Sequence, residues 1–371
     1  MAVTLLSIAL AAVVITDAKD QVIRAKFLGH ATNEVRSLTF QDVPEPETLC
    51  WVQFPKLNMA LTAYELTGDA THLQNFTNAF EKLRATVKIG PDGFLGWYGR
   101  PAPTLLDPAK PNAVISEIQT DFRAAGVLSR YMELAGKQPE YLDLLENHLV
   151  AKWEKSFTDL GEHGGVYQWN TEYLPAKAGI TLSHEKQAII IEGLLNLYRV
   201  TGKDAYRQRA AKLGMWLKHC LQLKEGRYVW NFWDPAGPWD EASPGKWKHW
   251  LGTEPKEMWY AATVRSAVLL FQHGVVFDRA DIDRLLKTQL EVCWQGDSFF
   301  QTDGNPAQKG ERFIAPALAP YNLGIFEYLY TGPRQDERVE KADNWWHGGI
   351  LAGDWLQGKY SKPKGIHENP P

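Results

Sequence analysis

Apolar and polar residues follow one another along this chain in an order that recurs five times. Each copy begins with a run that is apolar on nearly every side, continues through a short turn, and ends with a run that has one apolar and one charged face. The copies occupy residues 54–87, 120–153, 187–220, 261–294 and 321–346. Each copy therefore predicts a helical hairpin, with a buried first helix and an amphipathic second helix.

Glycine is the second residue of every turn, at Gly68, Gly136, Gly202, Gly274 and Gly332. Glycine adopts the left-handed backbone conformation without a steric penalty, and a helix often ends at such a residue. Each turn therefore predicts the end of one helix and a polar restart of the next. The recurring glycine is the feature that identifies the internal repeat.

Two kinds of helix in strict succession predict an inner and an outer ring. An open superhelix is the alternative, but its repeats are usually shorter and more uniform. Here long, irregular connections separate the hairpins, which favours a closed ring. Residues 3–28 and 343–357 supply helices for a sixth hairpin. The prediction is a single all-α domain over residues 21–371, a closed α/α toroid of about six hairpins with few long strands.

The connections between hairpins hold many of the glycines, prolines and tryptophans, as in residues 90–103, 160–179 and 228–252. They all follow an outer helix and precede an inner one, so they share one end of the ring. The chain has 15 Trp in 371 residues, and an indole ring offers a flat apolar face for a sugar. The sugar-stacking candidates are Trp51, Trp97, Trp169 and Trp230.

Position within the repeat gives the candidate site. Sixteen residues before the first four turns stand Trp51, Gln119, Glu185 and Glu257, in that order. Asp121 and Tyr260 follow at nearly the same depth. Sixteen residues make about 24 Å of helix, so these residues share the loop end of the inner ring, where they predict a cleft with a few polar groups. Helix capping is the alternative explanation for Glu185 and Glu257, because acidic groups favour helix N-termini.

Three further residue types suggest proton transfer or anion binding. His184 opens an inner helix beside Glu185, after a loop that contains Asn170, and a histidine titrates near neutral pH. Tyr321 follows two prolines, with Arg312 nearby. Arg265 lies within an apolar stretch, where it needs a carboxylate partner, either a protein acid such as Glu257 or a substrate uronate.

Charge and motifs exclude several classes of function. The net charge is -4 and no long basic run occurs, which argues against a nucleic-acid partner. The three cysteines lie far apart, and the sequence predicts no metal and no cofactor. The chain lacks nucleophile-elbow, zinc-protease and nucleotide-binding motifs. We expect a monomer with a polysaccharide or oligosaccharide substrate and no membrane span.

The first 20 residues admit two interpretations. Residues 1–16 carry no charge and include the run LLSIALAAVV, which is too short to span a bilayer and is typical of a signal peptide. No Lys or Arg stands near Met1, however, and the alternative is a first helix that runs on to Phe27. The first interpretation predicts a periplasmic or secreted protein.

The hairpins with their TGD and TGK turns, over residues 50–350, resemble the α/α toroids of carbohydrate-active enzymes, most of all toroidal polysaccharide lyases. This resemblance implies a fold more strongly than a reaction. It implies proton transfer by Tyr and His, with Asn or Arg at a uronate carboxylate. The residues that would take these roles are His184, Tyr260, Tyr321, Asn170, Arg265 and Arg312.

The leading functional hypothesis is therefore β-elimination on a uronic-acid polysaccharide, with substrate contacts from the stacking tryptophans and from Gln119, Asp121, Glu185 and Glu257. Unsaturated glucuronyl hydrolases share the fold, and Asp121 would be the candidate acid, but this chain has no pair of adjacent aspartates. Sugar epimerisation and a non-catalytic glycan-binding toroid are the remaining alternatives.

Overall fold

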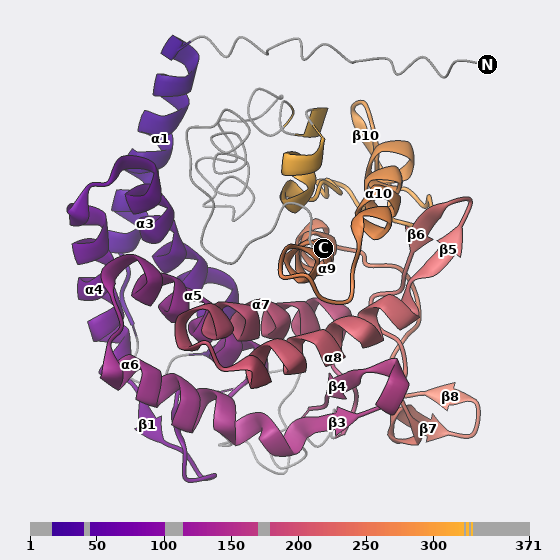
Figure 1. Ribbon diagram of the computed structural model, residues 1–371, viewed down its shortest axis with the longest axis horizontal. Helices are drawn as coiled ribbons and strands as arrows, with labels where there is room; N and C mark the ends of the chain where they lie inside the picture. The colour runs from indigo at the N-terminus through magenta and orange to yellow at the C-terminus, as the bar shows by residue number, and fades with distance from the viewer. Residues whose placement is uncertain are drawn as a thin grey trace.

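A computed structural model describes residues 17–40, 45–100, 114–169 and 179–322, together with residues 324, 325 and 328. Helices dominate this part of the chain, and its strands are two or three residues long. The predicted all-α class and the α/α toroid are confirmed (Figure 1). None of the helices in the described ranges is both long and apolar enough to cross a bilayer.

Four complete hairpins alternate inner and outer helices. The inner helices pack against one another in chain order: α3 (Phe54–Thr67), α5 (Ile118–Ala135), α7 (His184–Thr201) and α9 (Glu257–Gln272). The outer helices are α4 (Ala70–Arg84), α6 (Pro139–Asp143) with its continuations η3 (Leu144–Val150) and η4 (Ala151–Ser156), α8 (Asp204–Cys220), and α10 (Arg279–Lys287) with η8 (Thr288–Cys293). Three of these four hairpins begin within three residues of the predicted repeats; only α9 begins four residues earlier.

Shorter elements complete the described part. Helix α1 (Asp17–Arg36) packs beside α3 and α4, and η9 (Pro316–Tyr321) packs against α9. The first inner helix is preceded by α2 (Pro46–Thr48) and η1 (Leu49–Gln53). Phe27 on α1 is buried in the core, and α1 includes residues 17–27, the described part of the predicted first helix. Residues 1–16 and the turn at Gly332 lie outside the described residues.

A two-stranded antiparallel hairpin follows every outer helix, a regularity that the sequence analysis did not find. The pairs are β1 (Lys88–Ile89) with β2 (Leu95–Gly96), β3 (Phe157–Asp159) with β4 (Gly165–Tyr167), β5 (Gln222–Lys224) with β6 (Arg227–Val229), and β9 (Trp294–Gln295) with β10 (Ser298–Phe299). A further pair, β7 (Glu241–Ser243) with β8 (Lys246–Trp247), lies in the longest loop. These hairpins give the loop end of the ring a defined structure.

The glycine stops form as predicted. Gly68 and Gly202 both adopt the left-handed conformation, with φ of 70° and 72°, and each donates its amide to a tyrosine carbonyl at 2.7 Å. The threonine before each glycine, Thr67 or Thr201, donates its hydroxyl to a carbonyl four residues back, also at 2.7 Å. The second turn along the chain differs, because Gly136 combines φ 96° with an extended ψ of 156°.

Ion pairs join neighbouring inner helices, which corrects the prediction that these helices are apolar on nearly all sides. Glu192 of α7 pairs with Arg123 of α5 at 3.2 Å and with Arg265 of α9. Near the C-terminal ends of the same two helices, Arg199 of α7 pairs with Glu133 of α5 at 2.7 Å. The side chains of Arg123, Glu192 and Arg199 are all less than one-fifth exposed. Charge pairing thus holds adjacent inner helices in a fixed relation.

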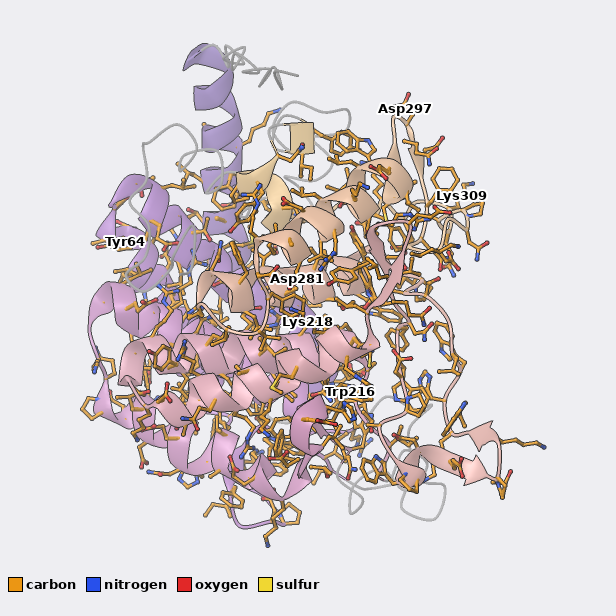
Figure 2. The ribbon with its side chains drawn as sticks, turned by 45° about the vertical axis from the view of Figure 1, so that its right-hand side comes forward. Tyr64, Trp216, Lys218, Asp281, Asp297 and Lys309 are labelled. Atoms are coloured by element: carbon orange, nitrogen blue, oxygen red, sulfur yellow. The ribbon has the colours of Figure 1, made fainter. Side chains whose placement is uncertain are left out.

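Outer helices are tied together as well. Figure 2 labels Lys218 on α8 and Asp281 on α10, whose charged atoms lie 2.6 Å apart. The same carboxyl group accepts a hydrogen bond from the Tyr228 hydroxyl at 2.5 Å. Asp281 also closes a capping box at the start of α10 with Asp278. One buried carboxylate therefore fixes α8, β6 and α10 relative to one another.

The closest packing in the inner ring is between α5 and α7. A Cβ atom added to Gly193 would lie 2.4 Å from the backbone oxygen of Phe122. Gly126 lies on the other side of the same contact, but a Cβ there would meet its nearest atom at 3.5 Å, an ordinary contact. Glycine is thus required at one of the two positions and optional at the other.

We expect Gly193→Ala to lower the free energy of unfolding by about 1–3 kcal/mol, because backbone atoms must move to admit the methyl group. Gly126→Ala is the matched control, and alanine's higher helix propensity should leave its stability equal or slightly greater. Chemical denaturation of both variants measures the difference. Equal stability of the two variants would show that α5 and α7 can separate without loss.

Candidate active site

The starts of α5 and α7 bring together buried polar side chains. Gln119, Asp121, His184 and Glu185 are each at most 2% exposed. In each of them one polar atom has no hydrogen-bond partner among the described residues: Gln119 Oε1, Asp121 Oδ1, His184 Nδ1 and Glu185 Oε2. Such an atom destabilises a protein by about 1–3 kcal/mol, and native structures contain few of them. Other such atoms occur elsewhere in the described residues, but these four share the starts of two neighbouring inner helices, which makes this region the candidate site.

Lys186 adds a cation to this cluster. Its ammonium group interacts electrostatically with Glu185, and more weakly with Glu117 and Glu47, and these carboxylates raise its pKa against the opposing effect of burial. The ammonium group also lies 5.0 Å from the centre of the Trp169 ring. Burial raises the pKa of Glu185, while Lys186 and the Ser183 hydroxyl oppose the rise. The start of α7 therefore presents a carboxyl group and an ammonium group side by side.

Glu254 is the residue that the sequence analysis missed. It lies three residues before α9, is 1% exposed, and accepts hydrogen bonds from Trp230 Nε1 at 3.1 Å and from the Thr263 hydroxyl at 2.5 Å. Burial raises the pKa of Glu254 to about 8, and the nearby charge of Glu185 adds to the rise. A carboxyl group with this pKa is largely protonated at neutral pH, which suits a general acid.

Counting back from the turn selected Glu257 instead, three residues later. The Glu257 carboxylate accepts a hydrogen bond from the backbone amide of Arg312, and its own amide donates to Glu311 at 2.8 Å. Glu257 thus joins the start of α9 to the segment at 311–312, which is close to the capping role considered as the alternative. Arg312, predicted to bind a sugar acid, takes part in this contact through its backbone amide.

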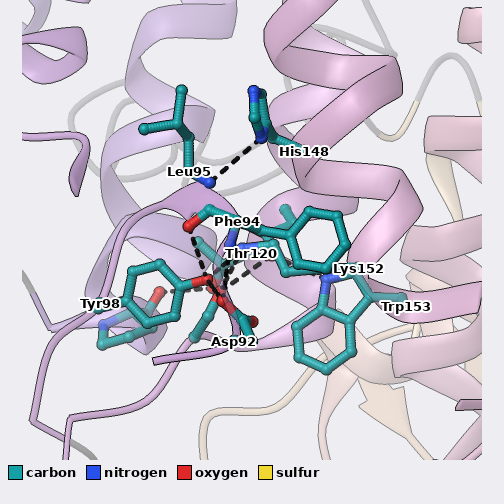
Figure 3. A network of polar contacts seen from close by, with 11 residues as sticks. Asp92, Phe94, Leu95, Tyr98, Thr120, His148, Lys152 and Trp153 are labelled. Carbon is teal, nitrogen blue, oxygen red and sulfur yellow. Dashed lines mark hydrogen bonds and ion pairs between the residues drawn. The ribbon is translucent and has the colours of Figure 1, made fainter. Parts of the chain in front are cut away.

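Asp121 belongs to a buried network that holds α5 to two other elements, and Figure 3 labels Tyr98, Lys152 and Trp153 of this network. Its Oδ2 atom lies 2.8 Å from Trp153 Nε1, 2.9 Å from the Ser116 hydroxyl and 3.0 Å from Lys152 Nζ. Lys152 also reaches the Tyr98 hydroxyl at 3.4 Å, which in turn donates to Asp92 at 2.6 Å. Burial raises the pKa of Asp121, although Lys152 opposes the rise. One oxygen of Asp121 thus serves the scaffold.

Two of the four predicted sugar platforms are buried in the structure. Trp97 is fully buried, with Phe54 against its ring and its Nε1 donating to the carbonyl of Leu83 at 3.2 Å. Trp230 is 1% exposed and stacks on Tyr260. Neither ring has a face open to a sugar. Trp169 is largely buried beneath Lys186, and Trp51 is partly exposed.

The exposed tryptophans lie elsewhere, in the long loop before α9. Trp247 is 39% exposed and Trp250 is 47% exposed. Trp250 stacks on Phe232 with ring centres 5.4 Å apart and an interplanar angle of 9°. Stacking on one face leaves the indole rigid while its other side remains in solvent. No repeat position identified these residues, because the loop has no counterpart of equal length in the other hairpins.

Tyr260 was predicted as a catalytic residue, and the structure places it in the core instead. It is fully buried, and its hydroxyl donates to Gln289 Oε1 at 3.0 Å. Burial raises the pKa of Tyr260 well above its usual range. Tyr321 is partly exposed, and its hydroxyl accepts a hydrogen bond from Gln272 at 3.2 Å. The two tyrosines are therefore not equivalent candidates.

Arg265 has the carboxylate partner that its position required, but that partner is Glu192 rather than Glu257. The guanidinium side chain remains 39% exposed. Arg265 lies in the middle of α9, about two turns beyond Glu257. Arg265, Tyr260 and His184, which were assigned roles in one elimination reaction, therefore lie at different positions along the inner helices and in different surroundings. Asn170 lies outside the described residues.

His184 does open α7, as the sequence predicted, and it faces the outer ring. Its Nε2 atom lies 3.0 Å from Asp234 Oδ2, and its backbone amide donates to the carbonyl of Phe232 at 3.1 Å. The thiol of Cys220, at the end of α8, hydrogen bonds to the same aspartate, and burial together with this contact raises the pKa of the thiol. Cys220 and Asp234 are far from His184 in sequence, so no spacing motif connects them.

No protein-family model and no curated protein sequence matches this chain. Solved structures do resemble it. A sugar epimerase from a ruminal bacterium superposes with a TM-score of 0.56 at 13% identity, covering 92% of this chain and 99% of the other. Cellobiose 2-epimerase from Bacillus thermoamylovorans B4167 gives 0.54 at 15% identity, covering 92% and 88%. At these identities the likeness shows the fold.

A third structure is an α-1,6-mannanase of Salegentibacter sp. HEL1_6, in complex with α-1,6-mannotriose. Its TM-score is 0.51 at 15% identity, covering 94% of this chain and 90% of the other. That form is an inactive variant in which two adjacent aspartates are replaced by asparagine. The chain described here has no two adjacent aspartates. The shared toroid is therefore not accompanied by that pair of acids.

We expect Asp121→Asn to lower the free energy of unfolding by about 3–5 kcal/mol, because it leaves the buried Lys152 ammonium without its counter-ion. The control is Asp283→Asn, which removes an exposed pair with Arg279 and should lower stability by less than about 1 kcal/mol. Urea unfolding at neutral pH measures both. A loss at Asp121 as small as that at Asp283 would show that the buried carboxyl is protonated in the native protein.

Proposed function

We propose that this chain is a carbohydrate-processing enzyme that acts by proton transfer from buried carboxyl groups at the loop end of the inner helices. The observation that carries the proposal is that Gln119 and Glu185, at the starts of neighbouring inner helices, each have a buried polar atom without a hydrogen-bond partner in the described part of the chain. A sugar hydroxyl can both donate and accept, so a bound glycan would satisfy them. The toroidal fold, which the two epimerases and the mannanase share, supports this substrate class.

Hydrolysis is the reaction that the carboxyl groups serve best. In glycoside hydrolysis one carboxylic acid protonates the leaving oxygen, while a second carboxylate activates water or attacks the sugar. Glu254, with a pKa of about 8, has the properties of the acid. Glu185 is the second group: it interacts electrostatically with Glu254, and the neighbouring Lys186 favours its ionised form. The two residues come from different hairpins but from the same end of the ring.

β-Elimination is the second candidate, supported by Lys186 in this cluster. A cation beside the reacting sugar would neutralise a uronate carboxylate and acidify the neighbouring proton. Glu185 would then remove that proton, and Glu254 would protonate the leaving oxygen. In this form the reaction does not require Tyr260, which is buried in the core, or Arg265, which pairs with Glu192.

Product analysis on a panel of neutral and uronic-acid polysaccharides separates these reactions. We expect new reducing ends without the ultraviolet absorbance of an unsaturated uronic acid, which is the result for hydrolysis. Equal yields of reducing ends and absorbance would establish the elimination instead. A changed sugar without chain cleavage would point to epimerisation. Glycan binding without any conversion would overturn the enzymatic proposal.

Glu254→Gln should lower turnover by about 100-fold or more, the usual effect of losing a general acid. Because the acid form is required, turnover of the unchanged protein should fall as pH rises through about 8. The other titratable groups that interact electrostatically with Glu254 are Glu185, Tyr260 and Cys293. The pKa of Tyr260 lies well above its usual range and that of Cys293 is about 12, so neither explains a fall near this pH.

Glu241→Gln, at an exposed position on β7 in the same loop, is the matched control and should keep both the rate and the pH profile. Circular dichroism and thermal melting confirm that each variant is folded. A folded Glu254→Gln protein with normal turnover would exclude Glu254 as the acid, whatever the substrate.

A further inference from the structure

His184, Cys220 and Asp234 form a compact group of metal-ligating side chains outside the carboxyl cluster. One potential ligand atom from each of the three lies within 4.8 Å of the other two. They come from three elements: the start of inner helix α7, the end of outer helix α8, and the loop that follows β6. Only 2% of the His184 side chain and 18% of the Asp234 side chain are exposed. The group is therefore mostly buried but remains partly accessible to solvent through Asp234.

The separations are compatible with one ion bound between the three side chains. Tetrahedral zinc, with bonds of about 2.0–2.1 Å to nitrogen and oxygen and about 2.3 Å to sulfur, holds its ligand atoms about 3.4–3.6 Å apart. His184 Nε2 and Asp234 Oδ2 lie 3.0 Å apart. The Cys220 sulfur lies within 4.8 Å of a ligand atom of each of them. For an ion to bind all three, the nitrogen and the oxygen would separate slightly and the sulfur would lie within about 3.6 Å of each.

The surroundings fix the orientation of the ligands. Asn231 Nδ2 donates to the other carboxylate oxygen, Asp234 Oδ1, at 2.7 Å. Such outer contacts orient metal ligands and contribute to metal affinity. On the histidine, Nδ1 has no hydrogen-bond partner in the described part of the chain. The Asp234 contact alone therefore holds the imidazole ring through its nitrogens, and metal coordination would replace that contact.

We propose that His184, Cys220 and Asp234 bind one divalent transition-metal ion, best matched by Zn²⁺. One thiolate, one imidazole and one carboxylate suit zinc's preference for mixed nitrogen, sulfur and oxygen ligands in a tetrahedral arrangement. Ca²⁺ and Mg²⁺ prefer all-oxygen sites and fit less well. Binding releases the Cys220 thiol proton to solvent, the imidazole coordinates in its neutral form, and the carboxylate coordinates ionised.

The described residues supply three ligands, so the fourth position of a tetrahedral ion would take water or a substrate oxygen. Three protein ligands with an open position are typical of catalytic rather than purely structural zinc. The site also joins α7, α8 and the loop that carries Glu254. Metal binding would therefore fix the first turn of α7, next to Glu185, relative to that loop. This inference does not depend on the proposed reaction.

The test uses the full chain, stripped with a chelator and then titrated with Zn²⁺ or Co²⁺. We expect one tightly bound ion per chain, a higher melting temperature with metal, and a thiolate-to-cobalt charge-transfer band in the near ultraviolet. Cys220→Ser should abolish the band, and Asp234→Asn should weaken binding by about 100-fold. Asn231→Ala should weaken it by about 10-fold, the lower end of the usual effect of an outer contact.

His219→Ala is the matched control, because His219 is an exposed histidine next to Cys220 and represents adventitious binding at the surface. It should leave affinity and spectrum unchanged. The metal-free melting transition of each variant shows that it is folded, and Cys220→Ala replaces the serine variant if that one does not fold. Absence of the cobalt band in the unchanged protein, or equal zinc binding with and without Cys220, would overturn the proposal. Hydrolase activity is not needed for any of these measurements.

Discussion

The contact between α5 and α7 is the constraint on which the rest of the ring depends. Gly193 brings α7 so close to the Phe122 carbonyl that no side chain fits between them. Once the two helices approach this closely, their starts lie side by side, so Gln119 near the start of one and Glu185 near the start of the other belong to the same end of the ring. The site at the loop end is thus a consequence of helix packing in the middle of the ring.

Ion pairs extend this constraint to the neighbouring helices. Glu192 directly precedes Gly193 on α7 and pairs with Arg123 on one side and with Arg265 on the other. Each charge is partly desolvated, so removing one partner would leave another unpaired, which destabilises far more than an exposed pair would. These ion pairs therefore oppose sliding of the inner helices along one another. A site formed by the first residues of several helices keeps its geometry only if such sliding is prevented.

The sequence predicted what depends on local periodicity. The turns at Gly68 and Gly202, the start of α7 at His184, and the shared depth of Gln119 and Glu185 follow from spacing along a helix, because helical geometry converts residue number into height. The direction of a side chain around the helix, and the path of a loop, depend instead on tertiary packing. For that reason Trp97, Trp230 and Tyr260 were placed at the site although they are core residues, and Arg265 was given the wrong partner.

The residues that were missed show the same limit. Glu254 stands only three residues before α9. Counting sixteen residues back from the turn leads to Glu257, the first residue of the helix, and so does not select Glu254, which belongs to the loop. Its burial beneath Trp230 depends on how the loop folds back over Thr263. Asp234 and Cys220 come together with His184 only because β5 and β6 reverse the chain directly after α8. A sequence search for metal ligands relies on short spacings, and these three residues have none.

The first turn of α7 carries both His184, a proposed metal ligand, and Glu185, a proposed catalytic residue. A variant of His184 can therefore affect either function. Successive helical residues point about 100° apart, so His184 faces Cys220 and Asp234 while Glu185 faces the carboxyl cluster. A change at His184 would therefore act on Glu185 through the backbone that both share. Lost turnover in such a variant would not by itself make His184 the proton carrier. If Glu254 is the acid and His184 only holds the turn, the fall in rate near pH 8 should persist at a lower rate. If His184 transfers the proton, its removal should change the shape of the pH profile.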